Sequence, residues 1–172
     1  MTNHAARPTG GAKRRREEQG PPVNDVPYER RRDGAVVSTD RSRLDVDLVH
    51  RVLSATYWAK GIPRDVVERS IAGSIAFGLF EDERQVGFAR VVTDLATYAY
   101  LADVFVVEEC RGRGLGDWLV ESIRLHPQLQ GLRRFALITR DAGPLYARHG
   151  FSAPGNPAGY MEIVNRDVYE KR

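Results

Sequence analysis

The sequence predicts one mixed α/β domain of the α+β kind, built on a single mixed sheet. Its 172 residues are the length of one ordinary domain. Its composition, 42% hydrophobic and 28% charged residues, is that of a globular protein. The apolar patterns follow one another as two helices, three strands, a helix, a strand, a helix and a strand.

The first half supplies two helices and a hairpin. Apolar residues recur at helical spacing over 44–53, and Pro63 is well placed to open a second helix over 64–71. Residues 75–80 and 85–92 are rich in strand-forming residues and flank the charged turn 81–84, which predicts a hairpin. The apolar segment 98–107 predicts a third, central strand.

The second half contains a glycine-rich turn and the remaining elements. The turn spans 111–116 and leads into a helix that ends near His126. A short buried strand is expected at 135–138 and a helix at 141–148, stopped by Gly150. The last expected strand is 160–164, and Arg30, Arg31 and Arg32 would lie on one face of an early strand.

The charge is concentrated at the N-terminus. Residues 1–34 hold 8 Lys and Arg against 5 Asp and Glu, so the net charge of +3 belongs to this segment and the rest is balanced. Residues 1–27 are predicted to be a disordered basic tail, and 28–172 the folded domain. Since Glu17 and Glu18 adjoin its basic run and no aromatic residue is interleaved, we interpret the tail as a solvated extension, with a nucleic-acid tether as the alternative.

The composition also limits where in the cell the protein is expected and which partners it is expected to have. No apolar run approaches the roughly 18 residues of a membrane helix, and the N-terminus lacks the apolar core of a secretory signal. A single cysteine, Cys110, forms neither an internal disulfide nor a cysteine-based metal site. We therefore expect a cytoplasmic protein without a membrane partner or a metal.

The turn over 111–116 carries the strongest chemical signal. Gly112, Gly114 and Gly116 let the backbone approach a ligand closely, and exposed N–H groups at a helix N-terminus bind phosphate oxygens. A dinucleotide fold would have this turn in its first strand–helix unit, but here two helices and three strands precede it. A nucleotide-triphosphate loop ends in Gly-Lys-Ser/Thr, whereas Asp117 follows Gly116.

Two motifs resemble those of the GNAT N-acetyltransferases. The segment 106–116, with Arg111-Gly112-Arg113-Gly114 at its centre, is similar to the Arg/Gln-x-x-Gly-x-Gly/Ala motif that binds acetyl-CoA in that family. The segment 142–151 resembles the family's Ala-x-x-Leu-Tyr-x-x-x-Gly-Phe. The resemblance covers roughly residues 40–165. It implies the GNAT-like acyl-CoA N-acyltransferase fold, with acetyl-CoA as the co-substrate and transfer to a primary amine in a ternary complex.

The resemblance also implies a set of cofactor-binding positions. The strand before the turn would splay from its neighbour and meet the acetyl and pantetheine groups through its backbone. The N–H groups of the turn would hold the diphosphate. The residues concerned are Phe105, Val106 and Val107 on the strand and Arg111, Gly112, Arg113, Gly114, Leu115 and Gly116 in the turn. The family often has Asn three residues before the alanine of its second motif, where this chain has Thr139.

Two side chains are candidates for catalysis. The resemblance places Tyr146 beside the sulfur as the general acid that protonates the departing thiolate. Asp103 interrupts an apolar strand, where a carboxylate needs a partner or a function. It would orient the incoming amine or take its proton through water, or serve as a structural aspartate. Strand alternation predicts that Asp103 shares a face with Leu101 and Phe105, opposite Tyr98 and Tyr100.

The acceptor site is expected between the first two helices and the sheet. Tyr57 and Trp58, in the linker between the helices, would stack on an amine or cover the core. Arg90 would pair with Asp94 or Asp103, or meet a substrate carboxylate. Asp94 is a candidate acceptor contact that also fits a turn-ending role.

Three functional questions stay open at the level of sequence. The alternative to an enzyme is a CoA-binding sensor or interaction module with little turnover. The acceptor is a small amine or a peptide amine, and the acyl group is acetyl or a longer chain. A homodimer, formed through the terminal strand or Trp58, is suggested only by analogy with the family.

Overall fold

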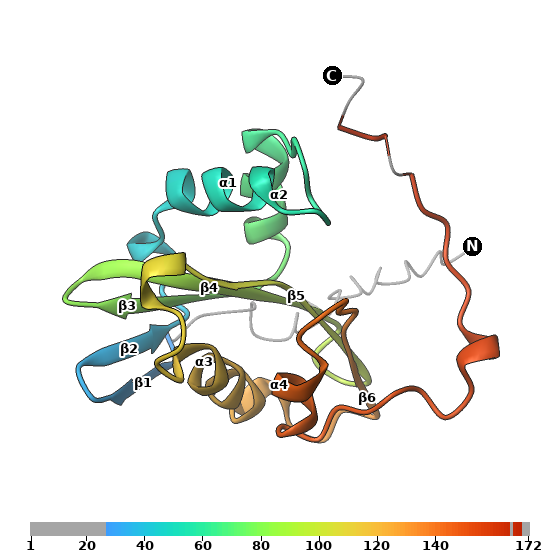
Figure 1. Cartoon of the computed structure of the whole chain (residues 1–172). Coiled ribbons are helices and arrows are strands. Elements are labelled where there is room, and N and C mark those ends of the chain that lie inside the picture. Colours follow the sequence, from blue (N-terminus) through green and yellow to red (C-terminus); the bar gives the residue numbers. More distant parts are fainter. Residues whose placement is uncertain (1–26, 166, 170–172) are drawn as a thin grey trace, which may run out of the picture.

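The computed structural model describes residues 27–165 and 167–169, and its centre is a six-stranded sheet. The expected basic tail falls almost wholly outside the described residues. The strands follow one another across the sheet in sequence order (Figure 1). They are β1 (Glu29–Arg32), β2 (Ala35–Ser38), β3 (Ile75–Glu81), β4 (Arg84–Thr93), β5 (Tyr98–Val106) and β6 (Arg134–Ala136).

Helices cover both faces of this sheet. α1 (Val46–Ala55) and α2 (Arg64–Ala72) lie on one face, and α3 (Leu115–Arg124) and α4 (Gly143–Ala147) on the other (Figure 1). Four short 3₁₀ turns complete the described elements, at Arg41–Arg43, Glu108–Cys110, Pro127–Leu129 and Pro157–Gly159. The mixed α/β single-domain expectation is confirmed.

Each face has its own core. On the α3 side, Trp118, Leu119 and Ile123 pack against Phe77 and Leu101 of the sheet. On the α1–α2 side, the buried residues are Val49, Leu53, Ala59, Ile62, Val67, Ile71, Ala76, Phe88 and Phe105. Burying apolar side chains on both faces makes the central strands continuous apolar runs, and this is why β3 was readable in the sequence.

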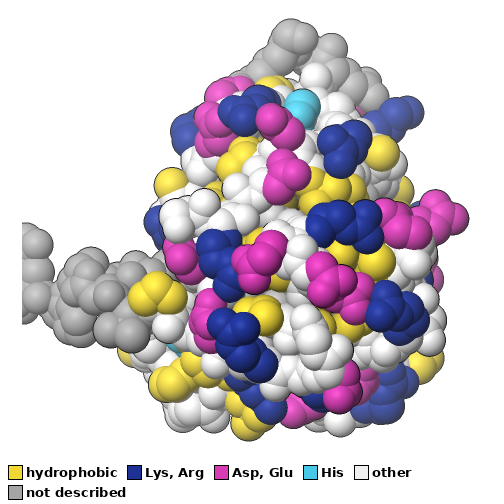
Figure 2. All heavy atoms as spheres, turned by 90° about the vertical axis from the view of Figure 1, so that its left-hand side faces the viewer, with side chains coloured by type: hydrophobic (Ala, Val, Ile, Leu, Met, Phe, Trp, Pro, Cys, Tyr) yellow, Lys and Arg dark blue, Asp and Glu magenta, His cyan; other side chains and the backbone are white. Residues whose placement is uncertain are grey.

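The first strands include one that the sequence did not reveal. Arg30, Arg31 and Arg32 do lie in a strand, β1, but they do not share one face. Successive strand residues alternate between faces, so Arg30 and Arg32 reach Glu121 and Trp118 of α3 while Arg31 points to the other side. Its partner β2 is a four-residue strand, wholly buried, and too short to show a strand pattern in the sequence. Figure 2 shows acidic and basic side chains intermingled over this side of the molecule. Arg43 bridges Glu29 and Glu83 there, in keeping with the balanced charge of the folded part.

The last predicted strand is wrong. Residues 160–164 pair with no strand in the described parts of the chain, and 152–165 are exposed throughout. Figure 1 shows this segment leaving α4 without joining the sheet as a strand. Met161 is 91% exposed despite its apolar side chain. Strand-like composition alone does not make a strand, because the backbone also needs a hydrogen-bonding partner.

Candidate functional site

The glycine-rich turn presents unpaired N–H groups to solvent. Gly112 and Gly114 have φ of 74° and 77°, a left-handed conformation that favours glycine, and no atom lies within 4 Å of where a Cβ would stand. Among the described residues, no acceptor bonds the N–H groups of 112–117, and Gly114 directly precedes α3. Unpaired N–H groups in such a turn at a helix N-terminus form a cradle that suits the oxygens of a phosphate group.

Side chains of the turn hold it against the sheet. Arg113 donates two hydrogen bonds of 2.8 Å to Glu81 at the end of β3. Arg111 donates from Nε to the carbonyl of Val106, over 2.9 Å. Both arginines therefore also brace the backbone of the turn, besides supplying the N–H groups that the resemblance implied.

The first turn of α3 is also tied to α4. Asp117 accepts hydrogen bonds from Arg148 and His149. Burial raises the pKa of Asp117, but these hydrogen bonds outweigh it and leave the pKa below its ordinary value. This connection could not be predicted from the sequence, because nothing in the spacing of residues 117 and 148 indicates that they meet.

Strand β5 opens away from β6, as the resemblance implied. The two strands run parallel and pair only from Tyr98 with Arg134 to Tyr100 with Ala136. β5 then continues to Val106 while β6 has ended, so the later part of β5 has a free edge toward β6. The turn over 111–116 follows directly, so the opening and the anion cradle adjoin.

Phe105, Val106 and Val107, which were predicted to contact the cofactor, differ in the direction in which their backbone groups point. The Val107 N–H donates to Val86 of β4, and its carbonyl accepts from Cys110, so both groups are engaged within the chain. The Phe105 carbonyl also lies against β4, near Gly87. Because successive peptide groups in a strand point to opposite edges, the N–H of Val106 faces the opening.

A bulge in β5 changes which residues share a face. Phe88 pairs with Phe105, but Arg90 pairs with Ala102, so β5 holds one extra residue between these points. Asp103 has φ of 55° there, which is uncommon for a residue other than glycine. The bulge reverses the alternation that the sequence suggested.

The prediction that Asp103 shares a face of the sheet with both Leu101 and Phe105 is therefore wrong for Leu101. Leu101 belongs to the α3-side core, whereas Phe105 belongs to the α1–α2 core, so the two do not share a face. Asp103 lies on the Phe105 side and pairs with Arg90 over 2.5 Å. Tyr100 faces the same region. Burial raises its pKa, and the nearby charges of Tyr160 and Asp103 raise it further.

Tyr146 lies on the other side of the sheet, in α4. Its ring is buried against Phe151, with 6.0 Å between the ring centroids. Its hydroxyl bonds to no other group in the part of the chain that the structure describes. Burial raises the pKa of Tyr146, and the neighbouring Tyr57 and Asp141 raise it further, so its phenol is protonated at neutral pH.

The linker between α1 and α2 approaches α4. Tyr57 and Trp58 make an edge-to-face pair at 4.9 Å and are both exposed. The guanidinium of Arg140, in the loop before α4, lies 3.7 Å from the centroid of the Tyr57 ring. Tyr57 thus stands near Tyr146 rather than covering the core, and sequence spacing had no signal for Arg140.

Asp94 lies apart from these residues. Its carboxylate accepts from the hydroxyl of Thr97 and from three backbone N–H groups, those of residues 96–98, in the turn between β4 and β5. These hydrogen bonds hold its pKa far below the ordinary value. Because these hydrogen bonds within the turn occupy its carboxylate, Asp94 does not form part of the proposed acceptor site.

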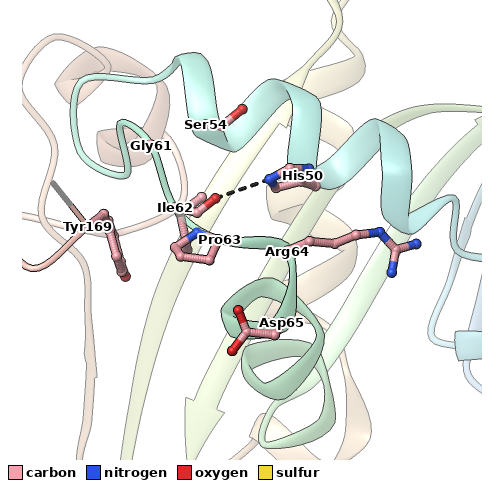
Figure 3. Close-up of a pocket in the computed structure, with 8 residues that line it drawn as sticks. All are labelled: His50, Ser54, Gly61, Ile62, Pro63, Arg64, Asp65 and Tyr169. Carbon is pink, nitrogen blue, oxygen red and sulfur yellow. Dashed lines mark hydrogen bonds between the residues drawn. The ribbon is translucent and has the colours of Figure 1, made fainter. Parts of the chain in front are cut away.

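A cavity of about 570 Å³ lies between α1, the linker that follows it and the start of α2 (Figure 3). Its lining includes His50, Pro63 and Tyr169, and a hydrogen bond of 3.1 Å joins the His50 ring to the Ile62 carbonyl. None of the predicted cofactor or catalytic residues lines it.

The described residues contain neither a helix that could span a membrane nor a cluster of metal-binding side chains. No helix in residues 27–165 and 167–169 is long and apolar enough to cross a bilayer. Within the same residues, no cluster of three or more His, Cys, Asp or Glu side chains could hold a metal ion.

The fold and the turn define an acyltransferase of the GNAT type, and comparisons with known proteins agree. The sequence pattern of the family described as "Acetyltransferase (GNAT) domain" matches residues 72–153. A protein of Gibberella zeae whose name assigns it to the acetyltransferases is 34% identical over 137 residues, which cover 66% of this chain and 76% of the relative. The chain belongs to the GNAT acetyltransferase family.

Solved structures support the same assignment. A GNAT-family acetyltransferase structure from Xanthomonas campestris pv. campestris is 54% identical, with a TM-score of 0.76, and the match covers 78% of this chain and 96% of that one. A structure from Clostridium acetobutylicum, described as an acetyltransferase with acetyl-CoA, shares the fold at 13% identity and a TM-score of 0.53, covering 70% of this chain and 90% of that one. The protein is thus an acetyltransferase of the GNAT family.

Proposed function

We propose that this acetyltransferase moves the acetyl group of acetyl-CoA to a primary amine by direct attack in a ternary complex. Acetyl-CoA supplies the acetyl group as a thioester. The N–H groups of 112–117 bind its diphosphate, and the free edge of β5 accommodates the pantetheine arm. The single observation that carries the proposal is the adjacency of these two features at the end of β5.

The strand edge also bears on the reaction itself. As the amine nitrogen bonds to the acetyl carbon, negative charge develops on the thioester oxygen. An N–H group held toward that oxygen stabilises the charge at no cost of rearrangement. The Val106 N–H, which faces the opening, is the group that we assign to the acetyl end of the cofactor.

The amine must lose a proton before it attacks. An aliphatic ammonium with a pKa near 10.4 costs about 4–5 kcal/mol to deprotonate at neutral pH without help from its surroundings. Asp103 is a carboxylate of β5 that lies on the α1–α2 side of the sheet. Because Arg90 holds one of its oxygens, we assign Asp103 to binding and orienting the ammonium, with water carrying the proton away.

Cleavage of the carbon–sulfur bond leaves a thiolate that needs a proton. Tyr146 is assigned as its donor, since its hydroxyl is protonated and unengaged within the described chain. Tyr57 and Trp58 would form the outer wall of the acceptor site. This proposal is supported by the family position of Tyr146 and by the approach of Tyr57 to it.

The test combines binding with turnover. Calorimetry with acetyl-CoA on the folded protein should give saturable binding. Thiol release over a panel of amines should give turnover that Tyr146→Phe lowers by about 100-fold without weakening acetyl-CoA binding. Binding without turnover on any amine would favour a sensor instead, and the absence of binding would remove the basis of the proposal.

A further inference from the structure

The Arg90–Asp103 pair lies where the helical cover of the sheet ends. On the α1–α2 face, Phe88 and Phe105 are buried beneath the helices, with ring centroids 6.0 Å apart. Further along the same face, Val92 is 42% and Tyr98 is 41% exposed. The ion pair stands between the buried and the open residues, on the side from which an acceptor would approach Asp103.

The guanidinium of Arg90 is only partly used. Its Nε donates to Oδ2 of Asp103, while Nη1 and Nη2 have no acceptor anywhere in the described residues. The side chain as a whole is 20% exposed. A buried donor without an acceptor costs stability, and the cost is larger for a charged group.

The carboxylate of Asp103 likewise uses only one of its two oxygens within the described chain. Oδ1 of Asp103 has no donor within the described chain, and its side chain is 10% exposed. Asp94, the other carboxylate that the sequence offered to Arg90, is engaged in its own turn. The chain therefore presents, side by side, free guanidinium donors and a free carboxylate oxygen.

This pairing matches a ligand that carries both charges. Two parallel guanidinium donors suit a planar carboxylate, and a carboxylate oxygen suits an ammonium. Resting on the proposed function, we infer that the acceptor is an amino acid: the terminal nitrogens of Arg90 bind its carboxylate, and Oδ1 of Asp103 binds its amine. An acceptor without a carboxylate would leave the Arg90 donors unsatisfied, which is a strong basis for discrimination.

The experiment compares matched acceptors. A panel of L-amino acids is assayed beside the corresponding α-amides and decarboxylated amines, with CoA release as the readout. The free amino acids should have kcat/KM values about 10- to 100-fold above those of their amides. Equal or better turnover of the members that lack the carboxylate would overturn the inference and leave the proposed function intact.

Substitution then assigns the preference to Arg90. Arg90→Gln should abolish the preference for the carboxylate, and Arg90→Lys should retain only a part of it, because an ammonium lacks the paired donors. Arg84→Gln, at an exposed arginine paired with Glu109, is the matched control and should keep the preference. A preference that persists in Arg90→Gln would contradict the assignment.

Two further measurements separate the possible failures. Urea unfolding and acetyl-CoA calorimetry show whether each variant is folded and binds the cofactor. If no amine of any series is turned over, the proposed function fails. Calorimetric binding of N-acetyl amino acids against their amides then still tests the carboxylate site, and equal affinities would overturn it.

Discussion

The guanidinium of Arg113 and the carboxylate of Glu81 form a two-bond bridge, with both hydrogen bonds at 2.8 Å. The bridge joins the glycine-rich turn to the end of β3, and Glu81 is the less exposed of the two side chains. A loop whose N–H groups bind an anion works best when its backbone is already in place before binding. The bridge is one means by which this chain holds it there.

Removing this bridge should weaken cofactor binding. Glu81→Gln keeps the shape but loses the charge, and we expect acetyl-CoA to bind about 2- to 5-fold more weakly, the scale of a partly exposed ion pair. Calorimetry measures the change. Glu109→Gln removes an exposed pair with Arg84 outside the turn and should leave the affinity as it is. Equal losses in the two variants would contradict a role for the bridge.

Gly114 and Gly116 should respond differently to alanine. At Gly114 the left-handed φ strains any side chain, although there is room for a Cβ, so Gly114→Ala should lower the free energy of unfolding by about 1–2 kcal/mol. Gly116 lies in α3, and its Cβ would stand 3.8 Å from Val106, an ordinary contact. Gly116→Ala should be neutral or stabilising. Urea unfolding tests both, and a reversed order would argue against the backbone conformation at 114.

The pH dependence of turnover should reveal Tyr146. Because burial raises its pKa above 10, the phenol remains a proton donor through the neutral range and stops donating only at high pH. The rate should therefore decline on the alkaline side above pH ~10, and Tyr146→Phe should lose this decline along with most of the rate. An unchanged alkaline limb in the variant would assign the titration to another group.

Stability should fall in mild acid because of His126. Its ring is buried between Tyr28 and Phe77, and Nδ1 accepts from the Gln128 N–H. Burial lowers its pKa, so below pH ~6.5 the unfolded chain takes up a proton that the folded protein resists. The free energy of unfolding should drop by on the order of 1 kcal/mol between pH 7.5 and 5.5.

Two variants isolate this effect. His126→Asn keeps a capping acceptor and should be less stable overall, but it should show a smaller loss between pH 7.5 and 5.5. Tyr28→Phe changes the neighbouring ring without removing the imidazole and should keep the pH dependence of the unmodified protein. An identical acid loss in His126→Asn would place its origin elsewhere.

Local features of this protein were predictable because local chemistry decides them. The glycines at 112 and 114 require a backbone that side chains disfavour, and the apolar spacing after them specifies α3, so the turn and the helix that follows it could be placed from sequence. The apolar run of β3 likewise indicated a hairpin strand, and that of β5 a central strand. Tyr146 could be named as a candidate because it lies in the second of the two family motifs.

Contacts between distant segments decided the rest. One extra residue in β5 sets Asp103 against Arg90 and separates it from Leu101, and only the register with β4 reveals that bulge. Residues 160–164 have the composition of a strand but no strand partner in the described chain, since pairing depends on which segments the fold brings together. Residue order encodes backbone preference within a few positions. The partner of each side chain follows from how the strands and helices pack.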